Sequence, residues 1–234
     1  MELSSKKILS ILEKNGVQSL FHANTVQTAC GFLSKGRLLS RGTQDEMGLP
    51  MSQQMTDGID VEHGLWYDLF VDTIDIHTQF KNRNFYGPVL FELDINILKK
   101  KWLPYVWIMK SNPSNWNTST KFEDKYFFSA DDFEKKFQFG QVDKLFSFRN
   151  IGGVIRLKDC LKRIILDHGG LSNERQDARI QAIGALFASA QIGGLVKPEI
   201  AIRNCLSNCG CKSKYTSPQM SDATYMKFFS PYAA

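Results

Sequence analysis

The order of strand-like and helix-like stretches is the feature that most constrains the fold of this chain. Residues 4–15 and 172–190 carry apolar side chains at helical spacing, whereas residues 88–95 and 103–109 are apolar or alternating, as strands are. These stretches follow one another without the strict strand–helix–strand alternation of a parallel sheet. The sequence therefore predicts an α+β fold. Because no linker or composition break interrupts residues 1–234, it also predicts a single domain.

Several expectations concern local structure. Residues 41–58 are polar, contain three glycines and a proline, and predict a long loop. Residues 157–167 predict a helix, and residues 111–140, which are polar and aromatic, are expected to form either an insertion or a lid. For the helix over residues 172–190 the expected buried stripe is Ile180, Ile183, Gly184 and Phe187.

Residues 17–40 carry the most specific local pattern. They begin as a short strand, after which Asn24 or Thr25 can cap a helix that Gly36 ends. His22 is therefore expected at the end of a strand, beside a helix N-terminus whose free N–H groups favour an anion or a carbonyl group. This arrangement is typical of a place that holds a polar ligand, and the alternative is a histidine with a purely structural role.

The same stretch resembles the N-terminal motif of ADP-ribosyltransferases, and among them the DarT-like branch that modifies DNA bases. The resemblance rests on an aromatic residue followed by His22, then polar residues and a short helix that closes on Lys-Gly-Arg-Leu-Leu-Ser at residues 35–40. It extends loosely over residues 65–95 and in outline over residues 172–203. It implies an ADP-ribosyltransferase-like fold, in which two small β-sheets form an NAD cleft with helices around it.

The resemblance also implies which residues bind NAD. His22, Asn24 and Thr25 would hold the ribose next to nicotinamide. Tyr67 or Phe70 would stack on the nicotinamide ring, although both could equally be core aromatics of a strand. The sequence lacks a Gly-x-Gly-x-x-Gly fingerprint, so NAD would bind without a Rossmann fold.

Glu199 is the catalytic residue that the resemblance implies, because it begins a strand-like run late in the chain, after two glycines and a proline. Cleavage of the nicotinamide–ribose bond gives an oxocarbenium-like centre and a leaving group that is already cationic in NAD. A fixed negative charge therefore helps more than a general acid. The family also uses an arginine between its two motif elements, but none occurs in residues 42–82. Arg41 is the candidate for this role, with Arg37 as the other nearby choice.

The distribution of charge along the chain indicates which molecule would accept the ADP-ribose. The net charge is +5, and residues 141–234 carry 13 Lys and Arg against seven Asp and Glu. A basic half favours phosphate contacts with nucleic acid. Together with the resemblance, this predicts a mono-ADP-ribosyltransferase that modifies a DNA or RNA base, acting as a bacterial toxin or phage-defence effector that an antitoxin protein restrains. The alternatives are an enzyme that modifies protein and an inactive binding module.

Metal chemistry gives one more alternative. Asp72, Asp75, His77 and Glu92 could form the divalent-metal site of a nuclease. On a strand, however, Asp72 would point away from Asp75 and His77. The three cysteines within residues 205–211 lack a Cys-x-x-Cys pair and a histidine nearby in the sequence. Reduced structural thiols are therefore expected there, and no metal.

Two absences bear on location. No run approaches the roughly 18 apolar residues that a membrane-spanning helix needs, and the first residues lack the apolar core of a secretion signal. Five cysteines form no even framework of spacings, which suits a reducing compartment. The sequence therefore predicts a cytoplasmic protein without a membrane partner.

Overall fold

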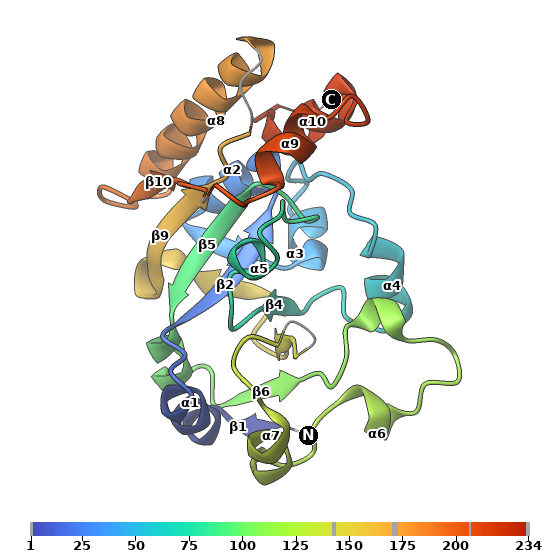
Figure 1. The fold of residues 1–234 in the computed structure, drawn as a ribbon. Helices are drawn as coiled ribbons and strands as arrows, with labels where there is room; N and C mark the ends of the chain where they lie inside the picture. Colours follow the sequence, from blue (N-terminus) through green and yellow to red (C-terminus); the bar gives the residue numbers. More distant parts are fainter. Residues whose placement is uncertain (1, 142–143, 170–172, 206, 233–234) are drawn as a thin grey trace.

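Two four-stranded β-sheets and one two-stranded sheet organise the computed structural model, which describes residues 2–141, 144–169, 173–205 and 207–232 (Figure 1). The first sheet has the order β10 (Ile200–Ile202), β9 (Leu161–Leu166), β5 (Val89–Asp94) and β2 (Ser19–Asn24). The second has the order β1 (Leu3–Ser4), β6 (Tyr105–Ile108), β7 (Phe146–Phe148) and β4 (Leu69–Val71). Strand β3 (Arg37–Leu39) pairs with β8 (Val154–Arg156).

The two four-stranded sheets meet at β2 and β4. Phe21 and Asp72 form an isolated antiparallel bridge there, with N–O distances of 2.8 and 2.9 Å. Within the first sheet β2, β5 and β9 are antiparallel, and β10 runs parallel to β9. This arrangement of mixed sheets and separate helices confirms the predicted α+β class.

The helices of the described residues surround these sheets (Figure 1). The α-helices are α1 (Ser5–Lys14), α2 (Val26–Ser34), α3 (Arg41–Glu46), α4 (Asp57–Glu62), α5 (Ile76–Phe80), α6 (Phe122–Lys125), α7 (Ala130–Lys136), α8 (Asn173–Ile192), α9 (Cys211–Thr216) and α10 (Asp222–Phe229). The 3-10 helices are η1 (Ile95–Lys99), η2 (Pro113–Asn115) and η3 (Leu157–Asp159). Among these helices, none is both long and apolar enough to span a lipid bilayer.

Helix α2 begins and ends where its sequence predicts. The Thr25 side chain accepts a hydrogen bond from the backbone N–H of Thr28, and Gly36 has a φ of +60° just after the last turn. Strand β2 is longer than predicted, however, because it pairs with β5 as far as Asn24. His22 therefore lies within the strand rather than at its end.

The predicted buried stripe of α8 was wrong for Ile180, Gly184 and Phe187, whereas Ile183 is partly buried against the main core. Ile180 and Phe187 are 55% and 43% exposed. The residues of α8 that are buried instead are Ala178, Ala182, Leu186 and Ala190. These residues recur every four positions, and small alanine side chains let α8 lie close against α2 (Figure 1).

Two other local predictions are corrected by the tertiary structure. Residues 157–167 form η3 and then β9, which is paired on one side with β5 and on the other with β10. Residues 41–58 are not one long loop, because they contain α3 and the first two residues of α4. The Ser40 hydroxyl caps α3 by accepting a hydrogen bond from the N–H of Thr43.

Residues 111–140 pack against the rest of the chain. Phe127, Phe133 and Phe137 are buried in the main core, whereas Trp116 and Tyr126 form a smaller cluster. The same segment begins beside the cavity described next.

Candidate functional site

A cavity of about 100 Å³ lies where the two four-stranded sheets meet. Its walls come from β2, from the start of α3, from α4 and from both ends of β4. Asn112 and Pro113, at the start of residues 111–140, also line it. The cavity is therefore built from segments that are far apart in the sequence and that meet through the contact of β2 with β4.

Four of the predicted NAD-binding and catalytic residues line this cavity: His22, Asn24, Arg41 and Phe70. Thr25 is not part of the lining, since it is buried as the cap of α2 and its hydroxyl lies 2.9 Å from that of Ser52. Tyr67 also lies outside the lining. It is 50% exposed, and its hydroxyl donates a hydrogen bond of 2.6 Å to Glu46.

The surroundings of His22 determine which ring nitrogen carries the hydrogen and whether the ring is charged. Its ring lies against Phe32 and Phe91, with ring centroids 5.8 and 6.4 Å away. Nδ1 is 2.8 Å from the carbonyl oxygen of Phe70, and because a carbonyl only accepts, Nδ1 carries the hydrogen. Burial lowers the pKa of His22; the Phe70 carbonyl opposes this effect, and the charge of Arg41 adds to it. His22 is therefore neutral, and its Nε2, which has no partner among the described residues, is a free acceptor.

Arg41 is held rigidly but keeps one free nitrogen. Its Nε and Nη2 donate to the two carboxylate oxygens of Asp57 at 2.9 and 2.6 Å, and Nη2 also donates to the carbonyl of Ser52. Its buried Nη1 has no partner among the residues that the structure describes, and the same holds for both amide atoms of Gln44. Buried polar atoms without a partner cost roughly 1–3 kcal/mol each, so a polar ligand that bonded to them would be bound strongly.

Three aspartates line the cavity, Asp60, Asp68 and Asp72, and the carboxyl group of each has a raised pKa. Burial raises the pKa of Asp72 to about 7. Burial and the neighbouring Asp57 carboxylate raise the pKa of Asp60 to about 7. Burial raises the pKa of Asp68 to about 6, although hydrogen bonds from Ser147 and Arg149 act in the opposite direction. Carboxyl groups that titrate near neutral pH in a cavity are candidates for acid–base chemistry.

Asp72 differs from the other two because its carboxyl group has no hydrogen bond or ion pair with any described residue. It follows β4 directly, and its backbone bridges to Phe21 of β2. Nothing in the local sequence pattern places these aspartates beside His22. A usable signal was present, however, since Asp68 and Asp72 flank an otherwise apolar and aromatic strand, where a carboxyl group is costly unless it has a function.

The structure does not bring Glu199 to this cavity. Glu199 is exposed and precedes β10, at the edge of the sheet opposite β2. Ile200 is in register with Ile164, Ile164 with Phe91, and Phe91 with His22. Three strand spacings of about 4.8 Å separate β10 from β2 by roughly 14 Å.

The four residues of the predicted nuclease site do not meet at one point. Asp72 lines the cavity, whereas Asp75 pairs with Arg203 and His77 faces Asp167. Glu92, which is on β5, contacts Ser19 of β2 and Lys162 and Arg163 of β9. Asp75 and His77 are neighbours, because the Asp75 carboxylate accepts a hydrogen bond from the backbone N–H of His77. Asp72 and Glu92 lie elsewhere, so the four residues do not share one metal ion in this structure.

No known protein-family model matches this chain, and no curated protein shows significant sequence similarity to it.

Proposed function

We propose that this chain is an NAD-dependent mono-ADP-ribosyltransferase that modifies a nucleic-acid base, and that the cavity holds the nicotinamide riboside end of NAD. The observation that carries the proposal is the meeting of His22, Asn24, Arg41 and Phe70 in one cavity. The resemblance had assigned these residues to the same reaction while they lay up to 48 positions apart. A cavity of this size is too small for a whole dinucleotide, so only the nicotinamide end of NAD would enter it.

The free polar atoms fit that ligand. Nε2 of His22 would accept a hydrogen bond from a ribose hydroxyl, because the Phe70 carbonyl keeps the proton on Nδ1. Nη1 of Arg41 would donate to the carbonyl oxygen of the nicotinamide amide or to a phosphate oxygen. The side-chain ring of Phe70 would lie against the nicotinamide ring.

Asp72 is the carboxylate that we assign to the chemical step in this proposal. The positive charge of the bound nicotinamide would lower the pKa of Asp72 and favour its ionised form. The bond from the ribose C1′ to the nicotinamide nitrogen breaks, and its electron pair leaves with neutral nicotinamide. The acceptor attacks C1′ and gives up a proton to the carboxylate, which also stabilises the developing cation.

The acceptor is proposed to be nucleic acid because of the basic residues 141–234. In the described part of that region the exposed lysines are Lys158, Lys162, Lys197, Lys212, Lys214 and Lys227, of which Lys162 also pairs with Glu92. Arg175 and Arg203, by contrast, are engaged in internal ion pairs and so contribute little to an outer surface. Binding through these lysines would weaken as salt concentration rises.

The test is transfer of label from NAD that is radioactive in its ADP-ribose part. The purified protein is incubated with single-stranded DNA, with RNA and with a mixture of proteins, and released nicotinamide is measured in parallel. We expect label on one nucleic acid only. Label on protein alone would overturn the acceptor, and absence of both label and nicotinamide release would overturn the enzyme in favour of a binding module.

Two carboxylate variants locate the reaction. Asp72→Asn is expected to lower the rate roughly 100- to 1,000-fold, which is typical when one preorganised electrostatic group is lost. Glu199→Gln is the matched control and is expected to leave the rate within about twofold, because Glu199 lies away from the cavity. The opposite result would move the reaction to β10, as the resemblance alone implied.

A further inference from the structure

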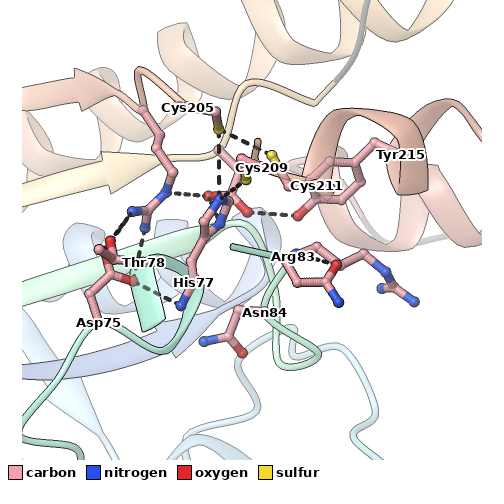
Figure 2. Close-up of polar contacts among 12 residues, drawn as sticks. Asp75, His77, Thr78, Arg83, Asn84, Cys205, Cys209, Cys211 and Tyr215 are labelled. Carbon is pink, nitrogen blue, oxygen red and sulfur yellow. Dashed lines mark hydrogen bonds and ion pairs between the residues drawn. The ribbon is translucent and has the colours of Figure 1, made fainter. Parts of the chain in front are cut away.

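Three cysteines and a histidine meet at a point outside the cavity (Figure 2). His77 lies on α5, Cys205 follows β10, Cys209 precedes α9 and Cys211 is the first residue of α9. One ligand atom from each of these residues lies within 4.8 Å of all the others. The sequence predicted isolated structural thiols because no histidine is near them in the chain, but the fold brings His77 to them across 128 positions.

We propose that His77, Cys205, Cys209 and Cys211 bind one structural Zn²⁺ ion. Three thiolates and one imidazole form a known zinc-binding set, and four protein ligands are typical of a closed, structural site. Sulfur donors disfavour Mg²⁺ and Ca²⁺, which prefer oxygen.

The distances between the ligand atoms are close to those around a tetrahedral zinc ion. With Zn–S and Zn–N bonds of about 2.3 and 2.05 Å, a tetrahedron places nitrogen about 3.6 Å from each sulfur and the sulfurs about 3.8 Å from one another. Nε2 of His77 lies 3.2 Å from the sulfur of Cys209 and 3.6 Å from that of Cys205. The sulfurs of Cys205 and Cys211 are 3.1 Å apart, so they would separate by several tenths of an ångström around the ion.

The other ring nitrogen of His77 is held as in many zinc sites. Nδ1 lies 2.9 Å from Oδ1 of Asp167, a buried carboxylate that also accepts hydrogen bonds from Arg203 and from the Tyr215 hydroxyl. A carboxylate behind a metal-binding histidine orients the ring and directs its Nε2 to the metal. Here Nε2 points to the cysteines (Figure 2).

The position of the site gives the ion a structural role. Cys209 and Cys211 flank the start of the C-terminal helices, whereas His77 is on α5, next to Ile76, which lines the cavity. A bound ion would therefore fasten Cys205, Cys209 and Cys211 to α5, whose first residue lines the proposed NAD site. This role does not depend on the reaction proposed above, because it concerns the stability of the fold.

The first experiment measures metal in the full-length protein purified under reducing conditions. Elemental analysis is expected to give about one zinc per chain. After the zinc has been removed, added Co²⁺ is expected to give the intense visible absorption of tetrahedral cobalt with thiolate ligands. Both Cys209→Ser and His77→Ala are expected to lower the zinc content by at least tenfold, and Cys30→Ser, which lies outside the cluster, is the matched control.

A second measurement tests the role of the ion. Chelation of wild-type zinc is expected to lower the melting temperature and to expose residues 205–216 to limited proteolysis, and added Zn²⁺ is expected to reverse both changes. If the ligand variants do not fold, the zinc content and the Co²⁺ spectrum of the wild-type protein still decide the question.

Three results would overturn the proposal. The first is wild-type protein that contains almost no zinc and gives no thiolate–cobalt spectrum. The second is a disulfide between Cys205 and Cys211 that persists under reducing conditions. The third is an iron–sulfur chromophore in place of zinc.

Discussion

Replacement of Asp72 by asparagine is expected to make the protein more stable at alkaline pH while it removes activity. In the folded protein burial raises the pKa of Asp72 from 3.8 to about 7, and no described residue bonds to its carboxyl group. Between pH 4 and pH 7 the folded state therefore holds a proton that the unfolded chain releases. The contribution of Asp72 to stability therefore decreases as pH rises through this window and stays at its lowest value above pH 7.

The magnitude follows from the same pKa difference. At about 1.4 kcal/mol for each unit of pKa, the ionised carboxylate costs the fold roughly 4 kcal/mol above pH 7. Water entering the cavity would reduce this figure. Asparagine has nearly the same shape and no charge, so Asp72→Asn should recover most of that free energy at pH 8. At pH 5, where the unfolded chain has already released the proton and the folded protein has not, it should recover less than half as much, roughly 1–2 kcal/mol.

Urea denaturation at pH 5 and pH 8 measures this effect. The quantity to compare is the difference in free energy of unfolding between Asp72→Asn and wild type, because the effects of Asp60 and Asp68 then cancel. Asp131→Asn, an exposed acidic residue of α7, is the control and should show a difference of less than about 0.5 kcal/mol at both pH values. If Asp72→Asn gains no stability between pH 5 and pH 8, then Asp72 is not held in an unpaired, desolvated environment.

Three further predictions concern the site and the packing around it. His22→Ala should lower ADP-ribose transfer at least tenfold, whereas His22→Gln, whose amide oxygen can still accept a hydrogen bond, should retain more activity. If both variants lost nicotinamide release to the same extent, the proposed role of Nε2 would be contradicted. Gly87→Ala should destabilise the fold by several kcal/mol, because Gly87 has a φ of +145° and an added Cβ would lie 2.2 Å from the Asn24 carbonyl; an unchanged melting temperature would refute this contact. Ala182→Leu should cost about 1–3 kcal/mol by overpacking the contact of α8 with α2, while Ile180→Ala should cost less than about 1 kcal/mol; the reverse order in urea denaturation would restore the stripe expected from sequence.

The local elements could be predicted from sequence where their patterns are complete within a few residues. Helices α1 and α2 and strand β5 have a cap, a stop or an alternating pattern of their own, and they occur close to where these patterns predict. Strand β9 could not be recognised. A short apolar run such as residues 161–166 suits a buried helix and a buried strand equally well, and its pairing with β5 and β10 decides between them.

The sequence by itself determined the α+β class and the strand and helix within residues 19–34. It also determined that Asn24 and Thr25, which follow His22, lie at the start of that helix. Only the tertiary structure decided which distant side chains come together: His22 and Asp72 in the lining of one cavity, and His77 with three cysteines beyond β10. It also separated Glu199 from His22 by placing their strands at opposite edges of one sheet. The physical reason is that propensity and periodicity depend on neighbours along the chain. Strand order and register, which decide where a side chain lies in space, depend on how distant segments bury their apolar faces together.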